Sequence, residues 1–349
     1  MKIENKNRII KLGLFILFII SIFLCLNIRN SKDYFIRNFP PLTASIHTFY
    51  NIAVTPLKPL QSPIEKFEEG MELPEIFIYD PINLSPVRNQ GKCGACWAFV
   101  IAGLLSDCIT IRVIKFNRNL NVQQLLSCYK EVPGCDGAAP EDVLIWLEKT
   151  GFKIAIDDEY LQSVSDCVIS DKGISVQKNS VSSLCNYIEN ECIKNPTKEE
   201  QDIINKNIYR MKLHIRTFGP IFTSISVYDD LFKFKGNKVY SKESNNFIGG
   251  HAVEIVGWCD KGVDLRENFK DGYWVCKNTW GKGWATGYDF PGYFAVKMGS
   301  NECGIESRTG AAHPNVEYLL REDDVAGEIA YTSYKELLEY LLEKEKSRF

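Results

Sequence analysis

The sequence has little net charge, no internal repeat and no low-complexity tract. Its 41 Lys and Arg residues nearly balance its 44 Asp and Glu residues, which leaves a formal net charge of -3. Without a basic surplus, the chain is not expected to bind nucleic acid. Hydrophobic residues make up 45% of the chain, which is enough for large packed cores, so global disorder is also excluded.

Long hydrophobic runs are absent, except that residues 12–26 are apolar apart from Ser21 and follow four basic residues. This run is at the short end of the roughly 17–25 residues that span a membrane, and no small-residue cleavage site of a signal peptide follows it. We therefore favour an uncleaved signal anchor in residues 1–28 over a cleaved signal peptide. The basic tip would stay in the cytosol, which makes the chain a single-pass membrane protein with its remainder extracytoplasmic or lumenal.

Cysteine, in contrast, is abundant, because the chain has 12 of them. This number suggests several disulfides and therefore an oxidising compartment of the secretory route. Residues 29–72 contain five prolines and no long helical pattern. The C-terminal residues 316–349 form an extension, in which residues 334–346 have the pattern of an amphipathic helix that is packed on the domain or solvated.

The order of periodic segments predicts the fold class. Helical patterns come first and strand patterns follow, with Gly151 ending the third helix. This order predicts an α+β chain of two lobes, with a substrate cleft between a helical and a strand lobe. The expected helices are residues 95–114, 122–128, 140–149 and 199–217, and the expected strands are residues 221–227, 252–258, 272–278 and 292–298.

Residues 90–99 combine a Gly-rich turn with the start of an apolar helix. Cys96 opens that helix, so we expect its side chain to be presented to a partner or substrate. The positive end of the helix dipole favours an anion there, and we expect it to lower the pKa of the Cys96 thiol toward the nucleophilic thiolate. The alternative is a buried or disulfide-bonded cysteine, which is frequent in a chain of this composition.

Three segments together resemble one family. Residues 86–99, around Cys96, resemble the active-site segment of papain-like cysteine proteases, which also have a distant His and Asn. Residues 249–258 and 277–284 resemble the histidine strand and the asparagine segment of that family. The resemblance covers about residues 73–315 and implies a two-lobed papain-like domain with a helical left lobe and a β-barrel-like right lobe. Within the family, the chain is most similar to cathepsin B.

The resemblance implies that the chain cleaves polypeptide substrates without a cofactor. It also implies a role for each of several residues. Cys96 is the nucleophile that forms a thioester, and His251 serves first as base and then as acid. Asn278 orients the imidazole, and Gln90 donates its side-chain amide to the oxyanion. Trp280 shields the hydrogen bond between His251 and Asn278 from water.

The same resemblance assigns residues to substrate binding. Gly137 and Ala138 stand where the family has Gly-Gly along the cleft, and Gly250 precedes the catalytic histidine. Arg308 stands where cathepsin B carries a Glu at the floor of its S2 pocket, so it would favour acidic or polar P2 residues unless it points to solvent. Cathepsin B acts as a carboxydipeptidase through two adjacent His in a loop, whereas residues 152–198 here contain no His. We therefore expect an endopeptidase.

The cysteines are assigned to disulfides by resemblance and position, because connectivity does not follow from sequence alone. Cys93 pairs with Cys135 by resemblance, which leaves Cys96 free. Cys93 and Cys96 also form a Cys-x-x-Cys, which alone suggests zinc or a redox pair, but no second pair follows at finger spacing, so no metal site is predicted. The other expected pairs are Cys128–Cys167, Cys185–Cys192 and Cys259–Cys276, with Cys108 and Cys303 unassigned.

Alternatives remain open for residues 29–72 and for the function. Residues 29–72 are either a short propeptide like that of cathepsin B, with processing near residues 70–73, or a plain stalk. The main functional prediction is a membrane-anchored cysteine endopeptidase of a secretory or lysosome-like compartment. One alternative is a catalytically silent papain-like binding module, although such relatives usually lose the Cys or the His. Another is a thiol–disulfide oxidoreductase that uses Cys93 and Cys96, but the thioredoxin-like βαβ setting is lacking.

Overall fold

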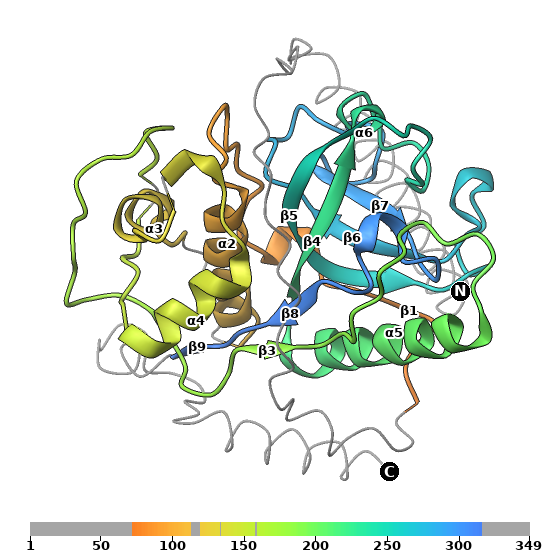
Figure 1. Cartoon of the computed structure of the whole chain (residues 1–349), viewed down its shortest axis with the longest axis horizontal. Coiled ribbons are helices and arrows are strands. Elements are labelled where there is room, and N and C mark those ends of the chain that lie inside the picture. The colour runs from red at the N-terminus through yellow and green to blue at the C-terminus, as the bar shows by residue number, and fades with distance from the viewer. Residues whose placement is uncertain (1–71, 113–118, 133, 158, 316–349) are drawn as a thin grey trace, which may run out of the picture. The chain divides into compact units, whose positions relative to one another are not determined.

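The computed structural model describes residues 72–112, 119–132, 134–157 and 159–315. They form a helical lobe and a sheet lobe, as the sequence predicts for an α+β chain (Figure 1). In these described ranges, no helix is long and apolar enough to cross a membrane. The expected anchor at residues 1–28 and the C-terminal extension lie outside the described residues, as does the expected propeptide or stalk apart from its last residue.

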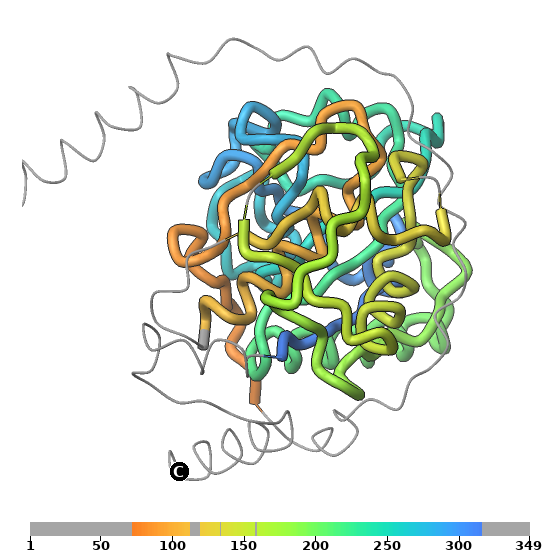
Figure 2. Tube along the Cα trace, turned by 90° about the vertical axis from the view of Figure 1, so that its left-hand side faces the viewer, coloured from red at the N-terminus to blue at the C-terminus, as the bar shows by residue number. Residues whose placement is uncertain are grey.

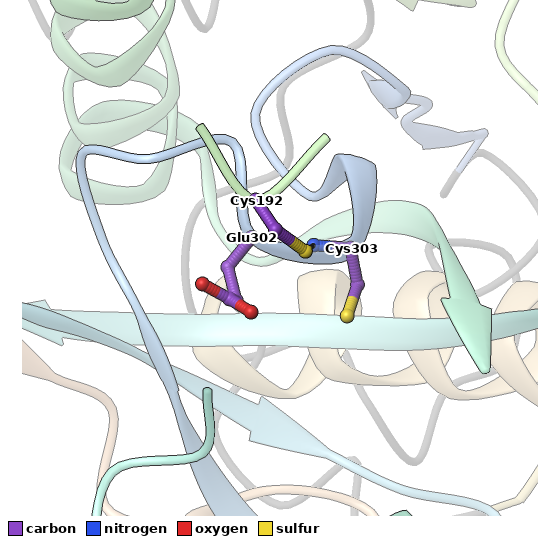
Figure 3. A group of neighbouring side chains, drawn as sticks. All are labelled: Cys192, Glu302 and Cys303. Carbon is purple, nitrogen blue, oxygen red and sulfur yellow. Dashed lines mark hydrogen bonds between the residues drawn. The ribbon is translucent and has the colours of Figure 1, made fainter. Parts of the chain in front are cut away.

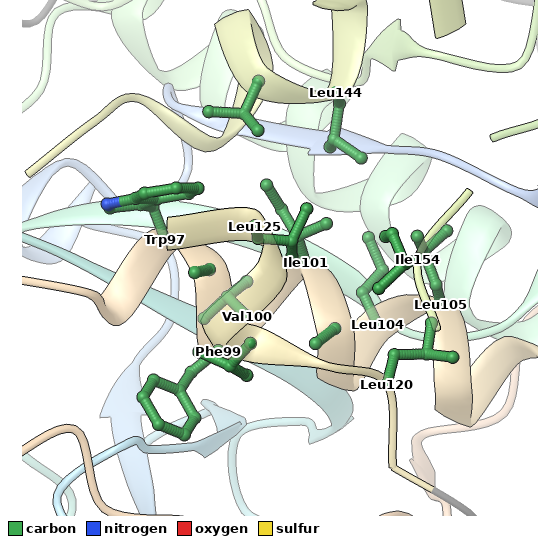
Figure 4. Packing of buried hydrophobic residues seen from close by; sticks show 14 of the residues in the cluster. Trp97, Phe99, Val100, Ile101, Leu104, Leu105, Leu120, Leu125, Leu144 and Ile154 are labelled. Carbon is green, nitrogen blue, oxygen red and sulfur yellow. The ribbon is translucent and has the colours of Figure 1, made fainter. Parts of the chain in front are cut away.

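The helical lobe is built around helix α2, Cys96–Arg112. Its side chains are apolar on nearly all sides, and Trp97, Ile101, Leu104 and Leu105 are fully buried (Figure 4). A helix that is apolar all round is stable only inside a core, so its neighbours must enclose it. In this lobe, α3 (Val122–Cys128) and α4 (Pro140–Thr150) pack on α2, and the 3-10 turn η3 (Gly134–Asp136) packs on α3. The sheet lobe covers another side of α2.

Helix α4 ends as the sequence predicts, because Gly151 adopts a left-handed C-cap with φ of 66°. The long segment after α4 has little regular structure. Figure 2, which views the molecule from the helical lobe, shows this yellow-green segment running across the face turned to the viewer. Its only regular strand before the sheet lobe is β2 (Ser175–Val176), which pairs with β9 (Pro314–Asn315) near the end of the described chain.

The sheet lobe contains one antiparallel sheet in the order β3-β8-β4-β5-β6-β7, with β1 added to β5. The central strand β5 is long because its first part pairs with β4 and its last three residues pair with β1. Among the described strands, no ladder joins β3 to β7, so hydrogen bonds do not close the expected barrel-like lobe. The strands are β1 (Ile76–Ile78), β3 (Ser182–Ser183), β4 (Ile221–Tyr228), β5 (Phe247–Cys259), β6 (Tyr273–Lys277), β7 (Tyr293–Lys297) and β8 (Thr309–Ala311).

Helix α5, Lys198–Phe218, packs on strands β4 and β5 of this lobe. It begins with a complete capping box, in which the Thr197 side chain accepts from the Glu200 backbone and the Glu200 side chain accepts from the Thr197 backbone. His214 on α5 and His313 stack against each other in the core, so both are packing residues. The remaining short helices are η2 (Pro81–Asn83), α6 (Asp229–Phe232), η4 (Glu267–Phe269) and η5 (Glu302–Gly304).

The two lobes meet where α2 packs against β5, around a buried charged cluster. The Lys277 ammonium lies 2.5 Å from Asp107 of α2 and 3.1 Å from Glu254 of β5, and it donates to Ser85 at 2.8 Å. Burial and the neighbouring Asp107 raise the pKa of Glu254 well above its usual value. Burial alone would lower the pKa of Lys277, but the two carboxyl groups raise it, so the ammonium stays charged. The cluster therefore ties the helix of one lobe to two strands of the other.

Candidate active site

Cys96 is the first residue of α2, at the end of a turn held by a disulfide. The Cys93–Cys135 bond and a 2.8 Å hydrogen bond from the Gly94 N–H to the Cys135 carbonyl fix this turn against η3. A Cβ at Gly94 would lie 2.4 Å from that carbonyl, so only glycine allows the close approach. The turn thus delivers Cys96 to the helix start, as the sequence predicts, although the thiol is almost completely buried.

His251 and Asn278 come from neighbouring strands of the sheet lobe. His251 lies in β5 and Asn278 follows β6, and their Nε2 and Oδ1 atoms are 2.7 Å apart. Trp280 stacks on the imidazole with ring centroids 4.6 Å apart, while Phe232 and Trp284 pack against the same indole. His251 is fully buried beneath these rings. The amide oxygen of Asn278 therefore contacts the imidazole of His251, and the indole of Trp280 covers that ring.

The Cys96 thiol meets the histidine strand across the lobe interface. The backbone N–H of Ala252, the residue after His251, lies near enough to the Cys96 thiol to lower its pKa. The nucleophile candidate Cys96 comes from α2 of the helical lobe, and the base candidate His251 comes from β5 of the sheet lobe. These two elements pack directly on each other. Their relative position therefore depends on how the lobes pack.

Both groups are held in their neutral forms by burial. Burial raises the pKa of Cys96 to about 11, and the N–H groups of Ala252 and Trp97 offset this only in part. Burial also lowers the pKa of His251 to about 4, against a smaller opposing effect of the hydrogen bond to Asn278. The expected lowering of the Cys96 pKa by the helix dipole is wrong for this conformation, because the loss of solvation outweighs the dipole.

Gln90 lies between the two lobes, next to the Cys96 turn. Its side-chain amide donates to the Cys93 carbonyl at 3.0 Å and accepts from the Thr279 hydroxyl at 2.5 Å. Its backbone N–H donates to the Thr279 carbonyl at 2.9 Å, and its own carbonyl accepts from the Tyr160 hydroxyl at 2.6 Å. The structure therefore brings Gln90 close to the segments that carry Cys96 and Asn278.

The expected substrate-binding glycines border this site from both lobes. Gly137, at φ of 92°, and Ala138 follow η3 beside the turn that precedes Cys96. Gly250 lies in β5 next to His251 and is opposite Ser226 of β4 in the register. Ala138 is buried, whereas Gly137 and Gly250 are partly exposed. Two glycines of the set are therefore placed so that a peptide can approach their backbone.

Arg308 is neither a lone charge nor exposed to solvent. Its guanidinium forms an ion pair with Glu191 and donates to the Ser226 hydroxyl at 3.1 Å, and that hydroxyl donates to Glu191 at 2.8 Å. The Arg308 and Glu191 side chains are only 13% and 15% exposed. The alternative of an Arg that points to solvent is therefore wrong, and the inverted charge is largely compensated. Sequence analysis missed Glu191, because it lies more than a hundred residues away in a segment without a motif.

The structure contains both Cys93–Cys135 and Cys128–Cys167, but neither of the other two expected disulfides. Cys259 lies opposite Tyr273 in the register and Cys276 lies opposite Ile255, so the two thiols are offset along neighbouring strands. Cys185 and Cys192 are also unbonded, and Cys192 lies beside Cys303 instead.

Comparison with known proteins gives one consistent result. A family model described as papain family cysteine protease matches residues 79–313. Cathepsin B-like cysteine proteinase 4 of Caenorhabditis elegans is 27% identical over 255 residues, which are 67% of this chain and 72% of that protein. Human cathepsin O is 30% identical over 262 residues, which are 71% of this chain and 70% of that protein. The solved procathepsin B S9 from Trypanosoma congolense has the same fold, with a TM-score of 0.57 at 24% identity over 80% of this chain and 89% of that one.

Proposed function

This chain belongs to the papain family of cysteine proteases, and we propose that it is an endopeptidase that cleaves polypeptides through a thioester on Cys96. The observation that carries the proposal is the 2.7 Å contact of His251 with Asn278 under Trp280, because His251 lies on β5 and β5 packs against α2, the helix that begins at Cys96. Nucleophilic catalysis by cysteine requires a thiol and an oriented imidazole from neighbouring elements.

In the proposed reaction, His251 takes the Cys96 proton and the thiolate attacks the scissile carbonyl carbon. The backbone N–H of Cys96 and the second side-chain N–H of Gln90 donate to the oxyanion. The imidazolium then protonates the leaving amine as the thioester forms. Water, activated by the neutral imidazole, hydrolyses the thioester and restores the thiol. Asn278 keeps the ring oriented, with its amide oxygen fixed in turn by the Thr279 N–H at 2.7 Å.

The neutral pair implies that the conformation described here is a resting state. A thiolate forms at Cys96 only when the pH rises through about 11, and an imidazolium forms at His251 only when the pH falls through about 4. Between these values neither charge is present. Water or substrate that enters the site would relieve the desolvation of both groups, so that their mutual attraction favours the ion pair.

Endopeptidase action is the proposal for the mode of cleavage. It is supported by the absence of any His from residues 152–198, so the segment that has paired histidines in cathepsin B cannot bind a C-terminal carboxylate in that way. The Cys128–Cys167 disulfide and a 2.9 Å hydrogen bond from the Gln124 side chain to the Val168 carbonyl also hold part of this segment on α3. The two disulfides support an oxidising compartment outside the cytosol, while membrane anchoring through residues 1–28 stays a prediction.

An epoxysuccinyl thiol probe tests the proposal directly. The full chain and a form trimmed to start at Leu73 would be treated at mildly acid pH under gentle reduction, and the label would be mapped by peptide mass. We expect stoichiometric label on Cys96 of the trimmed form, lost in His251→Ala. No label on Cys96 in either form would instead favour the silent binding module.

The pH profile of alkylation tests the resting state. With iodoacetamide, the rate at Cys96 in the conformation described here should rise continuously from pH 5 to 9, because the thiol pKa is about 11. An activated ion pair would instead give a rate that is already constant below neutral pH. We expect the first profile for the full chain and the second for the trimmed form. A plateau at acid pH in the full chain would contradict the resting state.

A further inference from the structure

Two thiols outside the active site lie side by side at the edge of the sheet lobe. Cys192 belongs to the segment between β3 and α5, and Cys303 belongs to η5 (Figure 3). Their sulfur atoms and a carboxylate oxygen of Glu302 all lie within 4.8 Å of one another. The backbone N–H of Cys303 donates to the Cys192 sulfur at 3.3 Å.

The backbones that carry these thiols are already fastened together. The Cys192 N–H donates to the Asn301 carbonyl at 3.0 Å, and the Ile193 N–H donates to the Ser300 carbonyl at 2.7 Å. The Asn301 side chain donates to the Asn190 carbonyl at 2.8 Å. Two cysteines can be bridged without backbone movement only when their backbones are held close in this way. The two sulfurs therefore meet this condition in the folded chain.

The third member of the cluster favours a disulfide over a metal ion. Both carboxylate oxygens of Glu302 already accept hydrogen bonds, from the Lys242 N–H at 2.7 Å and from the hydroxyls of Ser241 and Ser300 at 3.2 and 3.1 Å. These donors satisfy a buried carboxylate that would otherwise have to seek a cation. Glu302 would have to give up some of these bonds to become a metal ligand.

We propose that Cys192 and Cys303 are a disulfide-forming site, which fastens the segment before α5 to the η5 turn. Cys192 is partly exposed and Cys303 is fully buried, so an external oxidant reaches Cys192 first. The Cys192 thiolate attacks a small-molecule disulfide of the glutathione class and releases one thiolate. Cys303 then loses its proton to solvent and attacks the Cys192 sulfur, which expels the second thiolate. One small disulfide is reduced to two thiols, and one protein disulfide forms.

The proposed bond also has a consequence for the site, and this part rests on the proposed function. Glu191 directly precedes Cys192, and Arg308 follows η5. A Cys192–Cys303 bond would therefore hold Glu191 next to Arg308 and keep the charge of the Arg308 pocket compensated. Oxidation would thus fix the compensated form of this pocket.

Peptide mapping of the full chain tests the site without any need for activity. The folded protein would be equilibrated with oxidised and reduced glutathione, its remaining thiols blocked with iodoacetamide, and the chain digested with trypsin. Cys192 lies in the tryptic peptide 179–194, together with Cys185, and Cys303 lies in the peptide 298–308. We expect most of peptide 298–308 to be linked to peptide 179–194.

Two matched variants make the result decisive. Cys185→Ser should keep the linked peptide, because it removes the other cysteine of the same tryptic fragment, whereas Cys192→Ser should abolish it. Hydrogen exchange should also report the bond, with the Cys192 and Ile193 amides exchanging about tenfold faster after reduction. A Cys185–Cys192 loop within peptide 179–194, alkylation of both Cys192 and Cys303 in the folded protein, or zinc bound through the two thiols would each overturn the proposal.

Discussion

The helical lobe and the sheet lobe each supply part of the candidate site, but different bonds hold them in shape. In the sheet lobe, backbone ladders run from β4 through β5 and β6 to β7 in a nearly continuous register. None of its described cysteines is in a disulfide. In the helical lobe, the segment after α4 has almost no ladder. Both disulfides of the described residues lie in this lobe, and one of them, Cys128–Cys167, reaches into that segment.

In the helical lobe, buried glutamine side chains form the hydrogen bonds to backbone groups that strand pairing provides in the sheet lobe. The Gln123 side chain accepts from the Leu161 N–H at 2.9 Å and donates to the Ser163 carbonyl at 2.8 Å. The Gln124 side chain accepts from the Ala155 N–H at 2.8 Å. Backbone groups that lack ladder partners must be satisfied by side chains, and a disulfide limits the entropy of such a segment when unfolded. The Cys128–Cys167 disulfide therefore holds a segment in which regular backbone pairing is missing.

The largest expected effect tests whether the two lobes act as one catalytic unit. Cys96→Ala from the helical lobe and His251→Ala from the sheet lobe should each lower kcat on a fluorogenic peptide by about 10⁴-fold or more. Because neither group works without the other, the double variant should be about as inactive as either single one. Melting curves of all three variants would check that they fold. A double variant that loses the product of the two single effects would mean that the residues act independently.

The second prediction concerns the buried charged cluster at which the two lobes meet. Lys277→Met leaves Asp107 and Glu254 buried without their cation, so we expect a loss of about 3–5 kcal/mol in the free energy of unfolding. Urea denaturation followed by tryptophan fluorescence measures it. Lys297→Met is the matched control, since the Lys297 ammonium is partly exposed and lies 3.9 Å from Asp271, so it should be nearly neutral. Equal effects of the two substitutions would show that the buried cluster does not hold the lobes together.

Sequence patterns predicted the long elements and the site residues, but not the side-chain environment. Helix α3 was expected at its observed bounds, and the Gly151 cap was expected from its residue type. Strands of two or three residues, such as β3 and β8, are too short to show an alternating pattern, so they were missed. The burial that keeps Cys96 and His251 neutral depends on packing between the lobes, and no local motif encodes it. The ion pair between Glu191 and Arg308 also depends on packing between segments far apart in the sequence, so no local motif predicts it.

The third prediction concerns the Cys128–Cys167 disulfide, which holds part of the segment after α4 on α3. The double variant Cys128→Ala with Cys167→Ala should lower the free energy of unfolding by about 4 kcal/mol, as expected for two cysteines separated by 39 residues. Hydrogen exchange should show where the loss acts. The amides of Ala155 and Leu161, which donate to glutamine side chains, should exchange faster, whereas amides in the β4–β5 ladder should not change. Uniform acceleration in both lobes would contradict the local role of the disulfide.

The smallest expected effect concerns the charge of Arg308, which forms an ion pair with Glu191 in the sheet lobe. With Glu191 present, the pocket charge is compensated, so the protein should show little preference between neutral and acidic P2 residues. Glu191→Gln leaves the Arg308 guanidinium without its carboxylate. We therefore expect kcat/KM for a substrate with Glu at P2, relative to one with Leu at P2, to rise about fivefold, the order of one screened ion pair.

Glu189→Gln is the matched control for this specificity change. It removes the same charge two residues away, from an exposed side chain of the same segment, so it should leave the P2 ratio unchanged. A separate Arg308→Gln variant should reverse the effect of Glu191→Gln, because the remaining Glu191 then repels acidic P2 residues. If neither Glu191→Gln nor Arg308→Gln alters the ratio, Arg308 does not face the P2 side chain. The ion pair would then only stabilise the position of the segment before α5, as the disulfides stabilise segments of the helical lobe.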